Sequence, residues 1–337
     1  MGNSSFSSEW DEFVKSRPEA SVFQLYGWKE VAEKGFGHRA HYLSRRKSGA
    51  LSAVFPLIEV KSPLFGHSLV STGFTVGGGP LVDDEAELHE MVEEAKALSQ
   101  KLGVSYLELR DVCGDFEGFV KRDDLYADFK GPIAQKEEDN LLQIPRKQRA
   151  VIRKALNSEL TVTIDRDAKD FFALYSRTMR DHGTPALPRH HFERLLKLFG
   201  EACEILTVRH DGRPISSVLS FYFSGVVLPY YTGSSHEARS LGSNDMMYWS
   251  VMRRAIELGM REFDFGRSKV GTGPYAFKHN WGFKARPITH QFHLVKAQGL
   301  PNLNPTNPRY RLMIEAWRRL PLPVANFISP FLSKDLA

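Results

Sequence analysis

The chain has 337 residues, of which 42% are hydrophobic and 25% charged, so it is long enough for two globular domains and has the composition of a folded protein. No apolar run approaches the roughly 18 residues that a membrane-spanning helix requires. The net charge of +5 falls short of the dense basic patches of a dedicated nucleic-acid binder, and sequence-specific DNA binding is not expected. It is compatible with anionic ligands such as phosphates, tRNA or lipid headgroups.

The first eight residues are polar and rich in serine, and they lack the basic and then apolar pattern of a secretory signal. We therefore expect a cytoplasmic protein. The two cysteines, Cys113 and Cys203, provide neither a disulfide framework nor a zinc cluster. No histidine lies in a metal-ligand pattern, so we expect no bound metal.

The first half of the chain predicts short helices within residues 8–31, followed by strands at 41–43, 51–60 and 67–72. Asp83 and Asp84 then precede a strong helix over 85–102, in which apolar residues recur at helical spacing. A strand over 104–110 follows Gly103.

Residues 131–140 are polar and charged, and we place a domain boundary there. The second half then repeats the plan of hairpin, strand, long helix and strand, and each long helix ends in Leu-Gly. The expected helices are 171–180, 189–198 and 244–258, and the expected strands are 204–210, 214–223, 226–232 and 262–265. We predict an N-terminal domain over 1–135, a C-terminal domain over 141–298, and a linker with a helical tail over 299–337.

The second half also contains a series of motifs that resembles the FemAB family and its GNAT-like acyltransferase relatives. The motifs are Arg149 with 152–155, Tyr230-Tyr231-Thr232-Gly233, Gly242 to Asp245, Phe263-Asp264-Phe265-Gly266 and the segment 275–283. The resemblance covers about residues 141–295 and extends weakly over 23–110. It implies an α/β (α+β) fold of two tandem GNAT-like domains, each with a mixed central sheet flanked by helices.

Within that family the chain is most similar to the subgroup associated with PEP-CTERM (exosortase) and exopolysaccharide loci. The segments His182-Gly183-Thr184-Pro185 and 266–273 carry this similarity. Better-known relatives transfer amino acids from aminoacyl-tRNA to amines of peptidoglycan precursors. The coiled-coil arm of tRNA-using relatives has no counterpart here, so the donor is left open between acyl-CoA and aminoacyl-tRNA. No permanently bound cofactor is expected.

The loop before the helix 244–258 is the candidate site for the donor phosphates. Arg239, Gly242, Ser243 and Asn244 have the spacing of the acetyltransferase Arg/Gln-x-x-Gly-x-Gly/Ala loop. A helix N-terminus offers unpaired N–H groups, and an arginine adds a charge-assisted contact to phosphate. The alternative is an ordinary helix start capped by Ser243 or Asn244.

Three charged residues near the end of the second domain are the catalytic candidates. Asp264 is the candidate base for the attacking amine, while Lys278 and Arg267 are candidates for stabilising the oxyanion or holding a phosphate. By resemblance, the lysine of the Phe-Lys segment stabilises charge at the reaction centre. The alternative is an ion pair between Asp264 and Arg267, with Lys278 solvated at a strand edge.

Four further residues are candidates for lining the substrate site: Tyr230, Tyr231, His182 and Tyr275. Because neighbouring residues of a strand face opposite sides, only one of the two adjacent tyrosines is expected to face the site. The other tyrosine would then be a core residue. His182 is alternatively only a cap at a helix C-terminus.

Two basic segments extend the list of expected partners. Residues 145–154 carry five positive charges on an expected helix, which suits phosphate, tRNA or a pyrophosphate-linked lipid, or is simply a solvated face. The tail joins an extended linker (301–308), a short helix (311–320) and an apolar, proline-containing stretch (321–332). Such a tail either contacts the inner face of a membrane peripherally or packs on its own domain.

The sequence thus predicts an acyl- or aminoacyltransferase that modifies an amine on a cell-envelope or exopolysaccharide precursor by direct attack. Two alternatives remain open: an acyl-CoA-dependent N-acetyltransferase of small molecules, and a non-catalytic assembly factor that keeps the fold.

Overall fold

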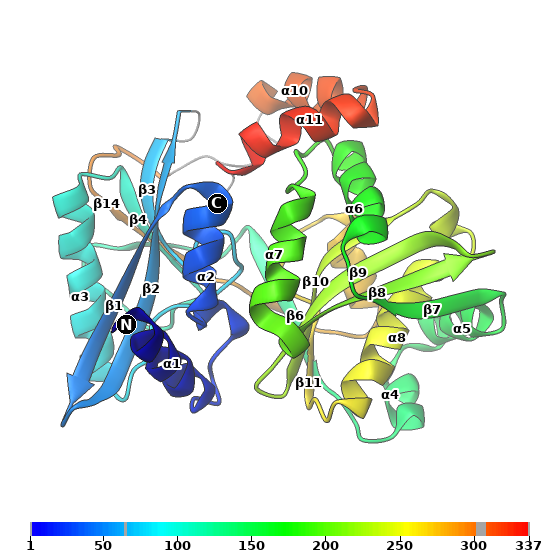
Figure 1. The fold of residues 1–337 in the computed structure, drawn as a ribbon, viewed down its shortest axis with the longest axis horizontal. Coiled ribbons are helices and arrows are strands. Elements are labelled where there is room, and N and C mark those ends of the chain that lie inside the picture. Colours follow the sequence, from blue (N-terminus) through cyan, green and yellow to red (C-terminus); the bar gives the residue numbers. More distant parts are fainter. Residues whose placement is uncertain (1, 64–65, 301–307, 336–337) are drawn as a thin grey trace. The chain divides into compact units, whose positions relative to one another are not determined.

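The computed structural model describes residues 2–63, 66–300 and 308–335, which form parts of two compact units (Figure 1). The first unit comprises residues 1–125, 287–302 and 334–337, and the second comprises 126–286 and 303–333. Each unit contains one mixed β-sheet with helices packed on it. The predicted fold class, two α/β domains that each have a mixed central sheet, is therefore confirmed.

The first unit is a six-stranded sheet in the order β1-β2-β3-β4-β14-β5, in which only β3 and β4 run parallel. Its strands are β1 (Arg39–Lys47), β2 (Ala50–Ser62), β3 (Gly66–Ser71), β4 (Tyr106–Arg110), β5 (Val120–Arg122) and β14 (His290–Leu294). Its helices are α1 (Gly2–Lys15), α2 (Gly27–Glu30) and α3 (Glu85–Leu102), with a 3₁₀ turn at Val22–Gln24 and a π turn at Val31–Phe36.

Helix α3 spans the predicted residues because both of its ends are fixed by capping interactions. The Asp84 carboxylate accepts the N–H of Glu87 at 2.8 Å, and the Glu87 carboxylate accepts the N–H of Asp83 at 3.1 Å. The helix packs Met91 and Val92 against one face of the sheet. Trp10 of α1 lies 4.8 Å from Tyr42 on the other side, measured between ring centroids, so the sheet is covered on both faces.

The second unit is an eight-stranded sheet in the order β12-β6-β11-β10-β9-β8-β7, with β13 paired to β6. Its strands are β6 (Tyr126–Pro132), β7 (Leu160–Asp165), β8 (Cys203–His210), β9 (Arg213–Phe223), β10 (Val226–Ser234), β11 (Glu262–Asp264), β12 (Ser268–Lys269) and β13 (Ala285–Pro287). Its helices are α4 (Glu137–Gln143), α5 (Arg146–Leu156), α6 (Lys169–His182), α7 (Arg189–Phe199), α8 (Ser243–Glu257), α9 (Gly273–Asn280), α10 (Pro308–Arg318) and α11 (Leu322–Ser333).

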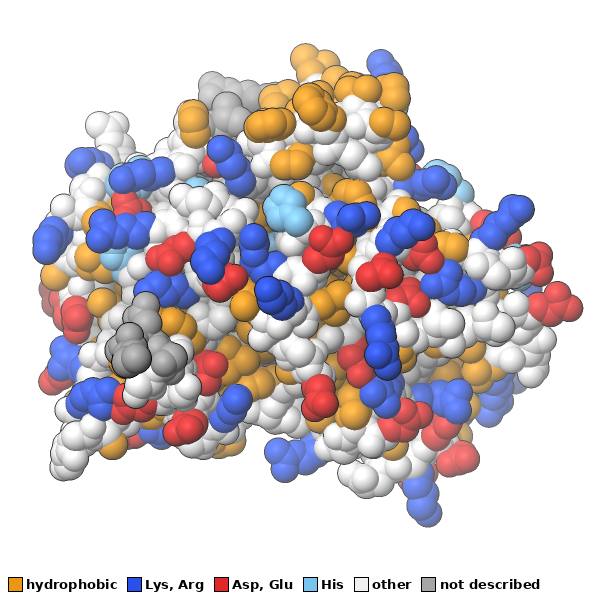
Figure 2. Space-filling view, viewed as in Figure 1, with side chains coloured by type: hydrophobic (Ala, Val, Ile, Leu, Met, Phe, Trp, Pro, Cys, Tyr) orange, Lys and Arg blue, Asp and Glu red, His pale blue; other side chains and the backbone are white. Residues whose placement is uncertain are grey.

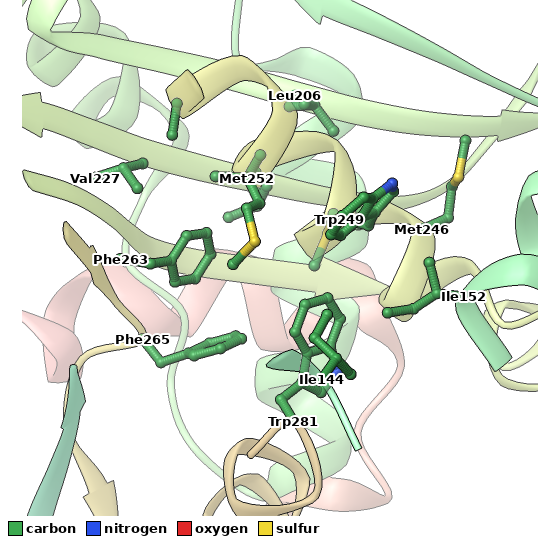
Figure 3. Close-up of a cluster of buried hydrophobic side chains, with 14 of the residues drawn as sticks. Ile144, Ile152, Leu206, Val227, Met246, Trp249, Met252, Phe263, Phe265 and Trp281 are labelled. Carbon is green, nitrogen blue, oxygen red and sulfur yellow. The ribbon is translucent and has the colours of Figure 1, made fainter. Parts of the chain in front are cut away.

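The main core of the second unit lies between the sheet and helix α8 (Figure 3). Trp249 from α8, Phe263 from β11 and Trp281 after α9 are almost completely buried in it. Alternate residues of β8 face opposite sides, so Leu206 and Val208 join this core while the neighbouring residues face α6 and α7. Helix α8 therefore has a rigid position in the unit.

Helices α6 and α7 cover the opposite face and come very close to the end of β10. A Cβ atom added to Gly233 would lie 2.2 Å from the backbone nitrogen of Tyr175, which only glycine permits. Thr178 accepts the Ser234 N–H at 2.9 Å and donates to the Ser234 carbonyl at 3.2 Å. This contact explains why a glycine ends the Tyr-Tyr-Thr-Gly motif.

The boundaries between the two units differ from the predicted domain boundaries at 135/141 and 298/299. The reason is that a strand within each predicted domain pairs with the sheet of the other unit. Strand β6 pairs with β11 and so belongs to the second unit, although it lies within the predicted N-terminal domain. Strand β14 pairs with β4 and β5 of the first unit, although it lies within the predicted C-terminal domain. The apolar end of the expected helical tail forms the helix α11, with Pro330 inside it, and residues 301–307 of the expected linker lie outside the described residues.

Candidate active site

The parallel strands β10 and β11 of the second unit stay paired over only two positions, Val226 with Glu262 and Val227 with Phe263. Beyond them β10 contains a bulge between Pro229 and Tyr231, and β11 ends at Asp264. Bulges of this kind redirect side chains and are frequent beside functional sites. The candidate catalytic residues lie near this point: Asp264 ends β11, Arg267 follows it, and Lys278 lies on helix α9.

Lys278 is a buried lysine of α9, with 7% of its surface exposed. Its Nζ donates to the carbonyl oxygens of Gly266 at 2.8 Å and Arg267 at 3.2 Å, and it lies 5.7 Å from the centre of the Phe129 ring. Burial lowers the pKa of Lys278 to about 8, against a partial opposing effect of the Asp264 charge. An ammonium has three N–H donors, so the two carbonyls orient it and leave one for a ligand.

Asp264 is buried at the end of β11 and is held from both sides. Its Oδ1 accepts the Gly266 N–H at 2.7 Å, and its Oδ2 lies 3.3 Å from the Nζ of Lys130 on β6. Burial raises the pKa of Asp264, although the nearby Lys130 charge opposes this. The carboxylate thus has an ion-pair partner in Lys130.

A second carboxylate extends this row of alternating charges along β6. Asp128 accepts a bidentate pair of bonds from Arg286, with distances of 2.7–3.2 Å, and also lies 3.9 Å from Lys130. Lys130 therefore lies between two carboxylates. Burial is the largest single effect and lowers the pKa of Lys130, but the nearby carboxylates together outweigh it and raise the pKa. No local pattern predicted Lys130, Asp128 or Arg286 as site residues, because strand β6 reaches β11 only through pairing between residues about 130 positions apart in the chain.

The side chains of Arg267 and Tyr275 contact aromatic rings beside Lys278. The guanidinium carbon of Arg267 lies 4.5 Å from the centre of the Tyr126 ring, a cation–π distance. Tyr275 stands edge-on to Phe129 with 5.1 Å between ring centroids. Both predicted residues therefore lie with Asp264 and Lys278, and the expected alternative of a solvated Lys278 is wrong because α9 buries it against Phe129.

The predicted donor loop forms the start of helix α8. Gly242 has φ +67°, the left-handed conformation that glycine favours, and it turns the chain from the 3₁₀ turn Glu237–Arg239 into the helix. The Ser243 hydroxyl is buried and lies 2.5 Å from the Ser216 hydroxyl, so it is not a free phosphate ligand. Arg239 is exposed and Asn244 is half-buried.

Asp245 links this helix start to Lys278's helix. Its Oδ1 accepts the indole N–H of Trp281 at 2.9 Å and also bonds the amide of Gln148 from α5. Burial raises the pKa of Asp245, and these hydrogen bonds partly offset the effect. The three helices α5, α8 and α9 thus meet at one carboxylate. Asp245 is the last residue of the motif from Gly242 to Asp245, but its bonds to Gln148 and Trp281 depend on the tertiary fold and were not predicted.

Helix α5 presents its positive charges beside the donor loop. A Cβ atom added to Gly242 would lie 3.4 Å from the Cβ of Ala155, which places α5 against the start of α8. Ile152 and Ala155 face inward, whereas Arg146, Lys147, Arg153 and Lys154 are exposed. The expected basic helix is therefore present, with its charged face on the surface near Gly242.

The two adjacent tyrosines of β10 do not face opposite sides as expected. The bulge leaves Tyr230 as the extra residue, and the rings of Tyr230 and Tyr231 lie 4.5 Å apart. Tyr231 packs edge-on against Tyr175 and Phe192 on the helix side of the sheet. The expectation from strand alternation was wrong because it assumed regular pairing.

His182 lies at the C-terminus of α6, where α10 packs. Its carbonyl accepts a long bond of 3.4 Å from Arg318, and burial lowers the pKa of its imidazole. Helix α6 ends at Gly183 as a normal C-terminal cap. The structure thus places His182 at the contact between α6 and α10, whereas Asp264 lies on β11 and Lys278 on α9.

Metal-binding clusters are absent from the described part of the chain, and its two cysteines differ in their exposure. No cluster of three or more His, Cys, Asp and Glu residues there is arranged to hold a metal ion. Cys203 is buried and its pKa is raised well above the ordinary range, whereas Cys113 is exposed.

The segment that carries this site is similar to a known family of domains. Residues 146–279, which include Arg239 to Asn244, Asp264 and Lys278, match the profile of the acetyltransferase (GNAT) domain. No curated protein sequence matches the chain.

Several solved structures share the fold over nearly the whole chain. The crystal structure of FemX has a TM-score of 0.70 at 19% identity, covering 91% of this chain and 98% of FemX. The C-terminal domain of a putative lysylphosphatidylglycerol synthetase from Agrobacterium fabrum has a TM-score of 0.60 at 14% identity, covering 87% and 93% of the two chains. A tandem GNAT protein from the clavulanic acid biosynthesis pathway, solved without acetyl-CoA, has a TM-score of 0.54 at 12% identity, covering 86% and 95%. At these identities the likeness establishes a tandem GNAT fold like that of FemX.

Proposed function

We propose that the protein is an N-acyl- or aminoacyltransferase whose reaction centre lies in the second unit, beside Lys278. The observation that carries the proposal is the state of this lysine. It is buried, oriented by two backbone carbonyls and has a pKa of about 8, so it is a positioned cation that titrates near neutral pH. The match of residues 146–279 to a GNAT domain supports acyl transfer as the reaction.

In the proposed reaction the amine nitrogen of the acceptor attacks the carbonyl carbon of the donor directly. A C–N bond forms, and the carbonyl electron pair moves to oxygen, where the remaining N–H of Lys278 stabilises the oxyanion. Asp264, whose pKa is raised by burial, accepts the proton of the amine. The carbonyl then re-forms as the bond to the thiol sulfur of acyl-CoA or to the ribose oxygen of aminoacyl-tRNA breaks. The proton held by Asp264 passes to that departing atom, and no covalent enzyme intermediate forms.

The donor phosphates would bind at the start of α8, with Arg239 as the charged contact and the exposed face of α5 beside it. Acyl-CoA and aminoacyl-tRNA both carry phosphates and therefore both suit this surface. The acceptor would be an amine on a peptidoglycan, other cell-envelope or exopolysaccharide precursor. This part of the proposal rests on the resemblance of residues 182–185 and 266–273 to the PEP-CTERM-associated subgroup and on the FemX-like fold.

Calorimetric titration with acetyl-CoA tests the donor site. We expect micromolar binding that Arg239→Ala weakens by about tenfold to a hundredfold, the usual effect of removing a charge-assisted hydrogen bond. Arg189→Ala, which removes an exposed arginine of α7 paired with Glu193, is the matched control and should bind normally. Absence of binding at millimolar acetyl-CoA would exclude acetyl-CoA as the donor, and a deacylated tRNA titration would then test the second donor.

A further inference from the structure

Helix α11 leaves its largest apolar residues exposed. Its fully buried residues are small, namely Ala325, Ser329 and Ser333, while the leucines and the isoleucine of the helix are half-buried. Its outward residues are large and apolar, and Phe327 and Phe331 are 75% and 64% exposed, with their rings 6.2 Å apart. A helix that packs only against its own protein normally turns its large apolar residues inward. The outward face of α11 is therefore built to contact something else.

The inward face is nevertheless firmly docked on the second unit. The Ser329 hydroxyl accepts the Ala186 N–H at 3.1 Å, and the Arg318 guanidinium of α10 contacts the His182 carbonyl at 3.4 Å. The helix thus has a defined orientation, and its exposed phenylalanines are not simply the result of a detached tail.

Helix α10 continues the same apolar surface. Leu312 and Met313 are 77% and 61% exposed, and Val324 of α11 is also exposed. These five residues are nearly half of the large hydrophobic side chains that are exposed in the described part of the chain. In Figure 2 hydrophobic side chains gather over the two helices, at the top of the view. Contiguous exposed apolar patches of this kind mark interaction sites.

The charge of the segment indicates the chemistry of the partner. Residues 308–333 contain four arginines and one glutamate, a net charge of +3, and α11 itself contains no charged residue. Arg318 and Arg319 are exposed at the end of α10, directly before the apolar helix. Large apolar side chains flanked by arginines and lacking surrounding acids match the interface of a bilayer that contains anionic lipids.

We propose that α10 and α11 form a docking surface for an anionic lipid bilayer, with Phe327 and Phe331 inserted at the level of the headgroups. No helix in the described ranges has the length and apolar character needed to cross a bilayer, so the contact is peripheral. A second copy of the chain is the competing occupant, but two such surfaces would bring their arginines together with only one glutamate each for compensation. The proposal does not depend on the chemistry at Lys278.

Vesicle flotation of the full chain tests this docking. The probe is a vesicle of phosphatidylglycerol and phosphatidylcholine, compared with phosphatidylcholine alone. We expect the chain to float with the anionic vesicles and to be released by high salt. The variant Phe327→Ser/Phe331→Ser should lose at least about tenfold in partitioning, because it removes most of the inserted apolar area. Arg318→Ala/Arg319→Ala should weaken binding to anionic vesicles by about tenfold, because the variant lacks the electrostatic attraction between the two arginines and the negatively charged lipids.

The matched control is Leu142→Ser/Ile164→Ser, which removes two exposed hydrophobic residues of the same unit, 62% and 45% exposed, from other elements. It should float like the wild type. All variants change exposed side chains, and equal melting temperatures would verify that they fold. If the wild type fails to float, or if the control loses binding equally, the proposal is wrong. A dimer in light scattering that dissociates only in the phenylalanine variant, without vesicle binding, would identify the second copy as the occupant instead.

Discussion

Both units contain a parallel strand pair whose two strands are connected by a long helix, β3-α3-β4 in the first and β10-α8-β11 in the second, and the residues at the end of the pair differ. In the first unit β3 and β4 pair over three positions, and the polar side chains beyond them bond one another. Glu108 accepts from Arg110 at 3.1 Å and from His290 at 2.7 Å, and Arg110 also donates to the Thr75 carbonyl at 3.1 Å. In the second unit β10 and β11 pair over only two positions before the bulge.

The pKa shifts of Glu108 in the first unit and Lys278 in the second show how the two groups of polar residues differ. Burial is the largest single effect on the pKa of Glu108 and raises it, but the charges and hydrogen bonds of Arg110 and His290 together outweigh burial and lower the pKa to about 2, so the carboxylate stays ionised. The Lys278 ammonium donates hydrogen bonds to two backbone carbonyls rather than to a carboxylate, and burial lowers the pKa of Lys278 to about 8. The first arrangement stabilises a fold, whereas the second keeps an ionisable group ready for a ligand.

The largest effect is expected for Glu108→Ala, which leaves Arg110 and His290 buried without their carboxylate. We expect the free energy of unfolding to fall by about 3–5 kcal/mol, the usual cost of removing one partner of a buried ion pair. Urea denaturation, followed by the fluorescence of Trp10 and Trp28 in the first unit, measures it. Glu117→Ala, at an exposed position, is the control and should change little.

The same pair of variants checks the pH dependence. The folded-state pKa of Glu108 lies below its ordinary value of 4.5, so its contribution is present above about pH 4.5 and is lost as the pH falls toward 2. Wild type and Glu117→Ala should both lose this stability in acid, whereas Glu108→Ala should not. Equal acid sensitivity of all three proteins would show that Glu108 is not held as an ion.

Lys278→Met tests the second arrangement. We expect the rate of acyl transfer to fall about 100-fold to 1000-fold, the typical effect of removing one oxyanion donor, while donor binding at Arg239 is retained. Transfer from a radiolabelled donor measures the rate, and calorimetry measures the binding. Lys284→Met, a lysine outside the site, is the control. A variant that keeps its full rate would remove Lys278 from the mechanism.

The smallest effect is expected for Gly233→Ala, which tests whether the motif glycine is needed for packing. The added Cβ would meet the α6 backbone at 2.2 Å, so we expect a loss of about 1–3 kcal/mol of stability. Gly273→Ala has no atom within 4 Å of its added Cβ and is the control. Melting temperatures of the two variants decide the matter, and equal values would mean that α6 shifts without cost.

Local patterns predicted much of the fold. The helix 85–102 was predicted at its observed bounds, because its aspartate cap, its helical apolar spacing and its terminal glycine all act locally. The domain boundaries could not be predicted in this way, because they depend on pairing between strands that are far apart in the sequence. Nothing in residues 126–132 indicates a partner at β11, and nothing in residues 290–294 indicates a return to β4.

The candidate site shows the same difference between residues that share a local motif and residues that are brought together by the fold. Asp264, Arg267 and Lys278 were found because they lie within about fifteen residues of one another in a recognisable motif. Lys130 was not predicted as a site residue, because its ion-pair partner Asp264 comes from another strand; the bond between Asp245 and Trp281 was not predicted for the same reason. The bulge at Pro229–Tyr231 was missed because a strand's own alternation does not reveal an irregular pairing with its neighbour.

The central claim is that Lys278 is a buried cation that titrates near neutral pH, and NMR tests it most directly. In protein labelled with ¹³C at the lysine ε carbon, the Lys278 resonance is identified by its absence in Lys278→Arg. We predict a titration midpoint near pH 8. A midpoint near the ordinary value of 10.5 would mean that Lys278 is a solvated lysine, and would contradict the proposed reaction centre.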